Sequence, residues 1–171
     1  EMCIRDRYDA SGELPLWPLS AGETGTMIGY HSTSIIADAY LKGICGYDAE
    51  HALEAMKISA EKNKKGADYY IKEDFIPTNI KKESVSCLLE FAYDDWCIAQ
   101  MAKALGHMDD YETFIKRSQN FINVFDGSTR VFRGKRQDGN WETPFDPFAI
   151  GRSYTEATAW QYRFFTPHDV Y

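Results

Sequence analysis

The chain has 171 residues, of which 44% are hydrophobic and 15% aromatic, and it carries a formal net charge of −7. This composition is typical of a folded domain and excludes an intrinsically disordered segment. The acidic balance, without a stripe of Lys and Arg, excludes a protein that follows nucleic-acid phosphates. The sequence also contains no run of about 18 uncharged apolar residues that could span a membrane.

We interpret residues 1–7 as a translated sequencing-adaptor scar, because Met2–Arg7 looks like the peptides found at the edges of assembled reads. Residues 8–171 are then expected to be an internal part of one larger domain. The four cysteines show no CxxC spacing, which argues against a zinc or redox motif. Cys87 and Cys97 lie in a helical pattern and are expected to be small buried hydrophobic residues.

The first half of the chain predicts one extended segment and two helices. Two prolines favour extended backbone over Leu14–Leu19, and a turn-rich loop follows at residues 20–25. Apolar periodicity predicts a helix from Thr26 to Leu41, and a second helix from the capping residue Asp48 to Lys62. A polar connection is expected over residues 63–82.

The second half predicts three more helices. Ser84–Leu105 is apolar around much of its circumference and should be buried on most sides, and a fourth helix is expected over Asp109–Val124. Residues 126–146 indicate a short β-hairpin or ordered excursion around Asp138-Gly139, before a last helix over Tyr154–Phe165. The paired helices predict an all-α fold of αα-hairpins, stacked in a ring or solenoid.

Three segments contain residues that suit chemistry. Trp17, Glu23 and His31 lie around a glycine-rich junction between loop and helix, where they could hold sugar hydroxyls or serve as a structural cap and a structural histidine. Asp94 and Asp95 are adjacent in a mostly apolar helix and point about 100° apart, so a capped or solvated structural pair is favoured over two groups in one site.

The third segment places Glu156 in the first turn of the last helix, four residues before Trp160. A carboxyl group beside an indole in an apolar cleft has its protonated form stabilised, which suits a general acid near neutral pH. The alternative is a carboxylate that only stabilises the helix dipole. The residues alone leave both interpretations open.

Together these segments resemble the glycoside hydrolase family 92 exo-α-mannosidases. The resemblance rests on LPLWPLSAGETGTMIGYHSTSIIADAY (14–40), ESVSCLLEFAYDDWCIAQMAK (83–103), FDP (145–147), YTEATAWQY (154–162) and PHDV (167–170). It implies part of an (α/α)6 toroid that hydrolyses terminal α-linked mannose of N-glycans or mannose oligosaccharides with inversion, dependent on Ca2+. It also implies a bacterial protein that is secreted, periplasmic or at the cell surface.

By motif position, the resemblance implies that Glu156 is the general acid, and that Gln161 contributes to the calcium and sugar shell. Trp17, Glu23, His31 and Trp160 are the implied substrate-binding residues. The sequence departs from the family pattern at Thr158, where Asn is commoner, and at Cys45 and Cys87, where polar or basic residues are expected.

An inverting glycosidase needs an acid and a base roughly 6.5–9.5 Å apart. The resemblance places the base aspartates after residue 171 and a sugar-contacting Trp-Asp motif before residue 1, so these residues alone are expected to be inactive. Two alternatives remain open at this point: a helical-repeat module that binds peptide or glycan without turnover, and a different (α/α)-toroid carbohydrate enzyme.

Overall fold

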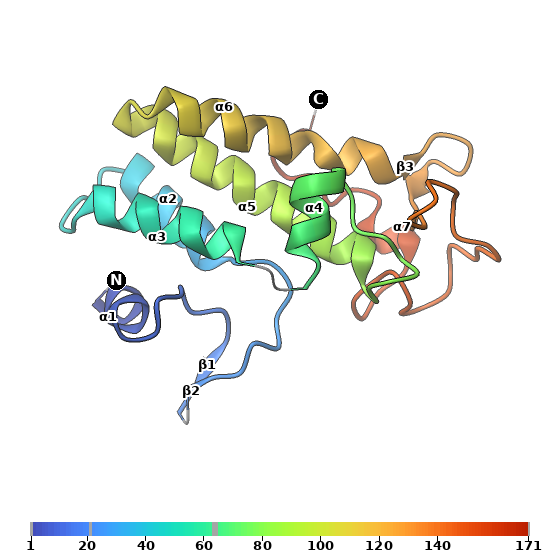
Figure 1. The fold of residues 1–171 in the computed structure, drawn as a ribbon, viewed down its shortest axis with the longest axis horizontal. Helices are drawn as coiled ribbons and strands as arrows, with labels where there is room; N and C mark the ends of the chain where they lie inside the picture. The colour runs from blue at the N-terminus through green and yellow to red at the C-terminus, as the bar shows by residue number, and fades with distance from the viewer. Residues whose placement is uncertain (1, 21, 63–64, 171) are drawn as a thin grey trace. The chain divides into compact units, whose positions relative to one another are not determined.

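The computed structural model describes residues 2–20, 22–62 and 65–170, and helices dominate it (Figure 1). The elements in chain order are α1 (Met2–Ser11), β1 (Pro18–Leu19), β2 (Gly22–Glu23), α2 (Ser32–Leu41), α3 (Ala49–Glu61), α4 (Ala67–Glu73), α5 (Ser84–Leu105), α6 (Met108–Arg117), the 3-10 helix η1 (Ser118–Val124), β3 (Phe125–Asp126), β4 (Val131–Phe132) and α7 (Ala159–Tyr162). The predicted all-α class is confirmed, since the strands form only two short antiparallel pairs within the described residues.

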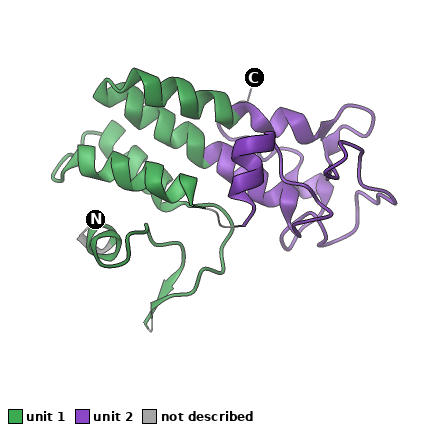
Figure 2. Ribbon diagram, in the orientation of Figure 1, with its two compact units in different colours: residues 1–62, 94–118 green, residues 63–93, 119–171 purple. Residues whose placement is uncertain are grey.

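The chain divides into two compact units (Figure 2). Unit 1 comprises residues 1–62 and 94–118, and unit 2 comprises residues 63–93 and 119–171. Helix α5 crosses the division between Tyr93 and Asp94, so its first half belongs to unit 2 and its second half to unit 1.

In unit 1, α2 and α3 form a helical hairpin. Asp48 caps α3 as predicted, because its carboxylate accepts a hydrogen bond from the backbone N–H of His51 at 3.0 Å. Across the hairpin, the Tyr47 hydroxyl donates to the Ile36 carbonyl at 3.1 Å. Helix α6 is joined to α3 by an ion pair between Lys57 and Asp110 at 2.9 Å. The core of this unit is apolar and includes Leu53, Met56, Ile98, Met101 and Phe114.

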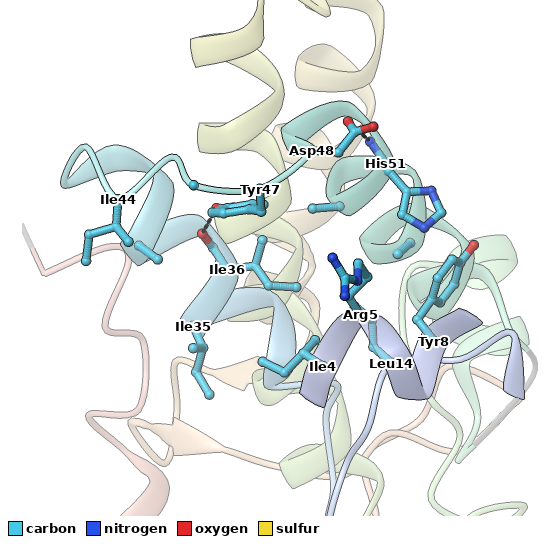
Figure 3. A pocket seen from close by; sticks show the side chains of 14 residues that line it. Ile4, Arg5, Tyr8, Leu14, Ile35, Ile36, Ile44, Tyr47, Asp48 and His51 are labelled. Carbon is cyan, nitrogen blue, oxygen red and sulfur yellow. Dashed lines mark hydrogen bonds between the residues drawn. The ribbon is translucent and has the colours of Figure 1, made fainter. Parts of the chain in front are cut away.

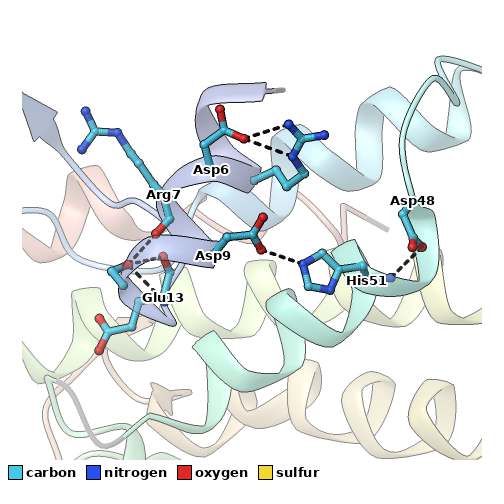
Figure 4. A network of polar contacts seen from close by, with 8 residues as sticks. Asp6, Arg7, Asp9, Glu13, Asp48 and His51 are labelled. Carbon is cyan, nitrogen blue, oxygen red and sulfur yellow. Dashed lines mark hydrogen bonds and ion pairs between the residues drawn. The ribbon is translucent and has the colours of Figure 1, made fainter.

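Helix α1 contains residues 2–7, the segment interpreted above as a scar. Figure 4 shows α1 beside α3, where Asp9 Oδ1 lies 3.0 Å from His51 Nε2. A helix can form on any sequence of sufficient propensity, so this interpretation stays a prediction. Residue 1, Ala21, residues 63–64 and Tyr171 lie outside the described residues.

A cavity of about 230 Å³ lies between α1, α2 and α3 (Figure 3). Its walls are mainly aliphatic and include Ile4, Leu14, Ile35 and Ile36, with Arg5, Asp48 and His51 among its polar lining. None of the predicted site residues lines this cavity, so it is separate from the segments that the sequence singled out.

In unit 2, β3 and β4 form a hairpin in which Phe125 pairs with Phe132 and Asp126 with Val131. A second turn at Asp138-Gly139 is closed by one isolated bridge between Lys135 and Trp141. The predicted β-excursion is therefore confirmed, although its regular strands lie at its start rather than around Asp138-Gly139. The core of this unit includes Tyr70, Ile76, Leu88, Leu89, Val124 and Val131.

Several predicted helix bounds are wrong for local reasons. The helix expected from Thr26 begins at Ser32, because Gly29 has a left-handed φ of 74° and the Tyr30 N–H donates to Asp94 rather than into a helix. The connection 63–82 contains the short helix α4, which seven residues are too few to reveal by periodicity. Helix α5 is confirmed with its predicted bounds.

The two remaining predicted helices are shorter than expected. The helix expected over Asp109–Val124 is α-helical only to Arg117, and the Ser118 hydroxyl donates to the Ile115 carbonyl at 2.8 Å where the 3-10 helix begins. The helix expected over Tyr154–Phe165 is reduced to α7, which begins only after Thr158. Among the described residues, no helix is both long and apolar enough to cross a bilayer.

Candidate active site

Trp17 and Glu23 are brought together by the β1–β2 hairpin of unit 1. Pro18 pairs with Glu23, and the Glu23 carboxylate accepts hydrogen bonds from the backbone N–H groups of Leu16 (2.8 Å), Trp17 (2.9 Å) and Gly25 (2.7 Å). Burial raises the pKa of Glu23, but these backbone hydrogen bonds outweigh it and hold the pKa below its usual range. Glu23 therefore stays ionised and organises the loop that carries Trp17.

The Trp17 side chain is available for a ligand, since the residue is 49% exposed on this loop. An exposed indole can stack on the apolar face of a sugar ring. Thr24 fixes the backbone at this point, because its hydroxyl donates to the Trp17 carbonyl at 2.9 Å. The hairpin thus presents the indole from a hydrogen-bonded backbone.

His31 lies at the N-terminus of α2, where its Nδ1 is 3.2 Å from Oδ1 of Asp94. The Asp94 carboxylate is fully buried and also accepts hydrogen bonds from the Tyr30 backbone N–H at 2.6 Å and the Thr33 hydroxyl at 3.3 Å. Gly29 leaves room for the imidazole, because a Cβ there would lie 2.6 Å from Cε1 of His31. The imidazole is therefore held from two sides while about a third of the His31 side chain stays exposed.

Asp95 is buried too, so the solvated form of the predicted acidic pair is wrong and the structural, hydrogen-bonded form is confirmed. The Arg117 guanidinium donates to both Asp95 oxygens, at 2.8 and 3.1 Å, and the Tyr30 hydroxyl donates at 2.6 Å. Such bidentate contacts offset the cost of burying the charge. Asp94 binds the Tyr30 N–H and His31, and Asp95 binds the Tyr30 hydroxyl and Arg117, so both carboxylates hold the Tyr30-His31 segment.

Glu156 in unit 2 does not lie in a helix, which corrects the prediction. It is an exposed residue in a bend, with a left-handed φ of 53°, two residues before the cap of α7. The argument that placed it on one helix face with Trp160 is therefore wrong. Within the described residues, no hydrogen bond or ion pair engages the Glu156 carboxyl group.

The backbone on both sides of Glu156 is fixed. Before it, the Ser153 carbonyl accepts hydrogen bonds from the N–H groups of Val85 and Ser86 at the start of α5, at 3.0 and 3.2 Å. The Thr155 N–H donates to the Ser86 hydroxyl at 2.8 Å. After it, the Gly151 N–H donates to the Ala157 carbonyl at 3.3 Å and closes the loop around Glu156.

Tyr154 anchors the same loop in the core of unit 2. Its side chain is buried, its hydroxyl donates to the Phe132 carbonyl at 2.5 Å, and its ring stacks on Tyr162 with centroids 6.0 Å apart. Burial raises the pKa of the Tyr154 phenol, which keeps it a hydrogen-bond donor. The left-handed backbone of Glu156 costs of order 1–3 kcal/mol, and the contacts of Tyr154 help the folded structure to maintain it.

Trp160 lies in α7 and is 38% exposed. Among the described residues its ring partners are Phe148, with centroids 6.2 Å apart, and the Arg163 guanidinium, 5.3 Å from the ring centroid. The structure therefore keeps Trp160 partly available to a ligand, as the prediction requires, although the indole does not form an apolar cleft around Glu156.

Gln161 and Thr158 form the cap of α7. The Thr158 hydroxyl accepts from the Gln161 N–H at 3.4 Å, and the Gln161 side-chain oxygen accepts from the Thr158 N–H at 2.9 Å. Thr and Asn both cap helices well, so the departure expected at position 158 is compatible with the cap of α7. The Gln161 side-chain oxygen uses one of its two lone pairs in this cap.

The described residues offer calcium no ready cluster of acidic side chains. Calcium takes about 6–8 oxygen ligands, whereas the described residues contain no group of three or more His, Cys, Asp or Glu that could hold a metal ion. Gln161 is the predicted ligand, and its side-chain oxygen keeps one lone pair beside the hydrogen bond that it accepts. The predicted residues thus fall into two sets: Trp17, Glu23 and His31 belong to unit 1, and Glu156, Trp160 and Gln161 to unit 2.

Sequence reasoning missed a polar cluster that supports the Glu156 loop. Thr78, Glu142 and Ser153 meet through side-chain hydrogen bonds, although Thr78 lies more than sixty residues before the other two. No sequence signal indicates such a cluster, because single polar residues in loops carry no periodicity.

Carbohydrate-processing enzymes use groups of the kinds found here. These are the partly exposed indoles of Trp17 and Trp160, the hydrogen-bonded imidazole of His31 and the exposed carboxyl group of Glu156. Comparison of the chain with known protein families agrees with a carbohydrate-processing enzyme. Residues 2–171 match the glycosyl hydrolase family 92 catalytic domain. The chain therefore belongs to glycoside hydrolase family 92.

Two solved structures of the same family and one secreted glycosidase are similar to the chain. A family GH92 α-mannosidase from Bacteroides thetaiotaomicron, solved in complex with mannoimidazole, is 39% identical and matches with a TM-score of 0.94 over 98% of this chain and 23% of that chain. A family GH92 inverting mannosidase from the same organism is 34% identical, with a TM-score of 0.92 over 97% of this chain and 24% of that chain. An uncharacterized secreted glycosidase of Arthroderma benhamiae is 29% identical over 98% of this chain and 27% of its own length.

The chain spans about a quarter of the length of these relatives. The matched structures are (α/α)6-toroid enzymes, so the expected architecture of αα-hairpins is confirmed. The match to a catalytic domain favours the enzyme over the non-catalytic helical-repeat module that the sequence left open.

Proposed function

We propose that this chain is part of an exo-α-mannosidase that removes terminal α-linked mannose from N-glycans or mannose oligosaccharides. Two relatives are described as mannosidases, one of them bound to mannoimidazole and the other as inverting. The observation in this chain that carries the proposal is the Glu156 carboxyl group, exposed and free of hydrogen bonds within the described residues, on a loop whose backbone is fixed on both sides.

In this proposal Glu156 is the general acid. Its carboxyl group gives a proton to the glycosidic oxygen while the bond from that oxygen to the anomeric carbon breaks. A water molecule forms the new bond to the anomeric carbon from the opposite face and loses its proton to a carboxylate outside these 171 residues. The products are free mannose with inverted configuration and the shortened glycan.

Substrate binding is proposed for the aromatic residues and for His31. Trp17 and Trp160 are each partly exposed and can stack on a sugar ring or on the aglycone. His31, held at Nδ1 by Asp94, can hydrogen-bond a sugar hydroxyl. Glu23 contributes indirectly, because its carboxylate is engaged by the backbone around Trp17.

We propose Ca2+ as the cofactor, held mainly by residues other than those described, since these contain no group of three or more His, Cys, Asp or Glu that could hold a metal ion. Secretion or display outside the cytoplasm is also proposed, supported by the relative described as a secreted glycosidase. Treatment of the intact enzyme with EDTA followed by Ca2+ should abolish and then restore mannose release.

Proton NMR of the first turnovers tests the proposal. The intact enzyme should release mannose from an α-linked mannobiose, and the anomer that appears first should be β, as inversion requires. No mannose release, with turnover of a different α-linked disaccharide, would assign another carbohydrate substrate. Initial formation of α-mannose would reject the inverting mechanism.

A further inference from the structure

We propose that Thr78, Ser153 and Glu142 are positioning residues that hold Glu156 in its reactive place. This inference rests on the proposed function, because it gives these residues a purpose only if Glu156 is the general acid. All three residues belong to unit 2, as Glu156 does, so the cluster and the loop lie in one compact body.

The three side chains make a short chain of hydrogen bonds. The Ser153 hydroxyl lies 2.8 Å from Oε2 of Glu142 and 2.6 Å from the Thr78 hydroxyl, whereas Thr78 Oγ1 is 3.5 Å from the same Glu142 oxygen. A carboxylate only accepts, so the shorter distance assigns the Ser153 proton to Glu142. The Thr78 hydroxyl then donates to Ser153, whose orientation is set from both sides.

The far end of this chain of hydrogen bonds is fixed by the β-excursion. Glu142 donates its N–H to the Gly134 carbonyl at 2.8 Å, and its carbonyl accepts from the Arg133 guanidinium at 2.6 and 3.1 Å. The same guanidinium binds the buried Asp126 carboxylate at 2.9 Å. Thr78 is held as well, since its N–H donates to the Lys135 carbonyl at 2.7 Å.

The near end leads directly to Glu156. Ser153 is fully buried, so the loss of the hydrogen bonds of its hydroxyl group would destabilise the folded protein. Its carbonyl accepts the α5 N–H groups of Val85 and Ser86, and Ser86 in turn holds the Thr155 N–H. Glu156 is the next residue, in the left-handed conformation that this anchoring imposes. A shift of the Ser153 backbone would therefore move the carboxyl group.

The test compares Thr and Ser at position 78, which carry a hydroxyl group, with Val, which lacks it. In the intact enzyme, Thr78→Val keeps the shape of the side chain but removes the hydroxyl that donates to Ser153, whereas Thr78→Ser keeps this hydroxyl. Ser153→Ala removes the hydroxyl that joins Thr78 to Glu142. Thr113→Val is the matched control, because Thr113 is exposed on α6 and its hydroxyl donates only to the Asp109 carbonyl of its own helix. Glu156→Gln is the reference for loss of the acid.

The readout is the ratio of kcat on an α-linked mannobiose to kcat on a dinitrophenyl α-mannoside. The disaccharide needs protonation of its leaving oxygen, whereas dinitrophenolate departs without it. The ratio does not depend on the fraction of folded enzyme, so a loss of stability alone leaves it unchanged.

We expect Thr78→Val and Ser153→Ala to lower the ratio about tenfold, as a carboxyl group misplaced by a fraction of an ångström would. Thr78→Ser and Thr113→Val should keep the wild-type ratio. An unchanged ratio in Thr78→Val and Ser153→Ala, with a lowered ratio in Glu156→Gln, refutes only the positioning role. A defect in Thr78→Ser equal to that in Thr78→Val refutes it too. An unchanged ratio in Glu156→Gln refutes the proposed acid role, and the positioning role with it.

Discussion

Gly134→Ala should loosen the Glu156 loop through steric pressure alone. A Cβ at position 134 would lie 2.7 Å from the Ser153 hydroxyl oxygen, 2.9 Å from Oε2 of Glu142 and 3.0 Å from Cβ of Thr78. Two of these contacts are shorter than real Cβ atoms show, so the cluster must separate. Overpacking of this kind costs about 1–3 kcal/mol.

A smaller effect opposes this cost. Replacing Gly by Ala at an ordinary backbone conformation stabilises by about 0.4–1 kcal/mol, because the unfolded chain loses freedom. The left-handed glycines do not include Gly134, so this gain applies. The net expectation is a loss of about 1–2 kcal/mol in the local free energy of opening. Gly127→Ala is the control, since nothing lies within 4 Å of its Cβ and only the gain remains.

The assay is amide hydrogen exchange in the intact enzyme, followed by mass spectrometry of peptides that contain the Glu142 and Thr155 N–H groups. A loss of about 1.4 kcal/mol speeds exchange roughly tenfold. Gly134→Ala should exchange faster than wild type in both peptides, and Gly127→Ala should not. Equal or slower exchange in Gly134→Ala would refute the reasoning that this cluster is tightly packed against the glycine.

Substitutions at Gly29, Asp126 and Thr158 test three other features of the structure. Gly29→Ala should lower mannosidase turnover about tenfold or more, because the new Cβ pushes the His31 imidazole away. Gly25→Ala is the control, since Gly25 has the same left-handed backbone but open space, and it should show only a loss of stability of about 1 kcal/mol. Burial raises the pKa of Asp126, but hydrogen bonds from its neighbours lower it to about 2, so its stabilisation is complete above the ordinary value of 3.8 and is lost as the pH falls towards 2. The unfolding midpoints of wild type and Asp126→Asn should therefore converge over that interval, and a constant difference would contradict this. Thr158→Asn should keep the cap of α7, while Thr158→Ala should raise hydrogen exchange at the Gln161 N–H, with a cost of about 1 kcal/mol.

The sequence predicted helices α3 and α5 well and predicted the site loops poorly. Helix α5 has its predicted bounds because twenty-two residues give a clear apolar pattern and glycine follows its end. Cys87 and Cys97 are buried there, as expected. The predicted start of the helix at Thr26 is wrong because the left-handed turn at Gly29 depends on Asp94, more than sixty residues away.

The same reason accounts for Glu156. An acidic residue at the start of this aromatic-rich segment predicts the first turn of a helix. The left-handed conformation that the structure shows is imposed by contacts with Ser86, Ser153 and Ala157. Ser86 lies about seventy residues before Glu156 and leaves no local pattern, so the backbone setting of Glu156 was not predicted.

The Glu156→Gln variant of the intact enzyme tests the central claim most directly. General acid catalysis contributes about 10²–10⁴-fold, so kcat on an α-linked mannobiose should fall by about that factor while kcat on a dinitrophenyl α-mannoside changes by less than about tenfold. Gln keeps the size and backbone setting of the residue and removes only the transferable proton. Full turnover of mannobiose by this variant, or an equal loss on both substrates, would contradict the assignment of Glu156 as the general acid.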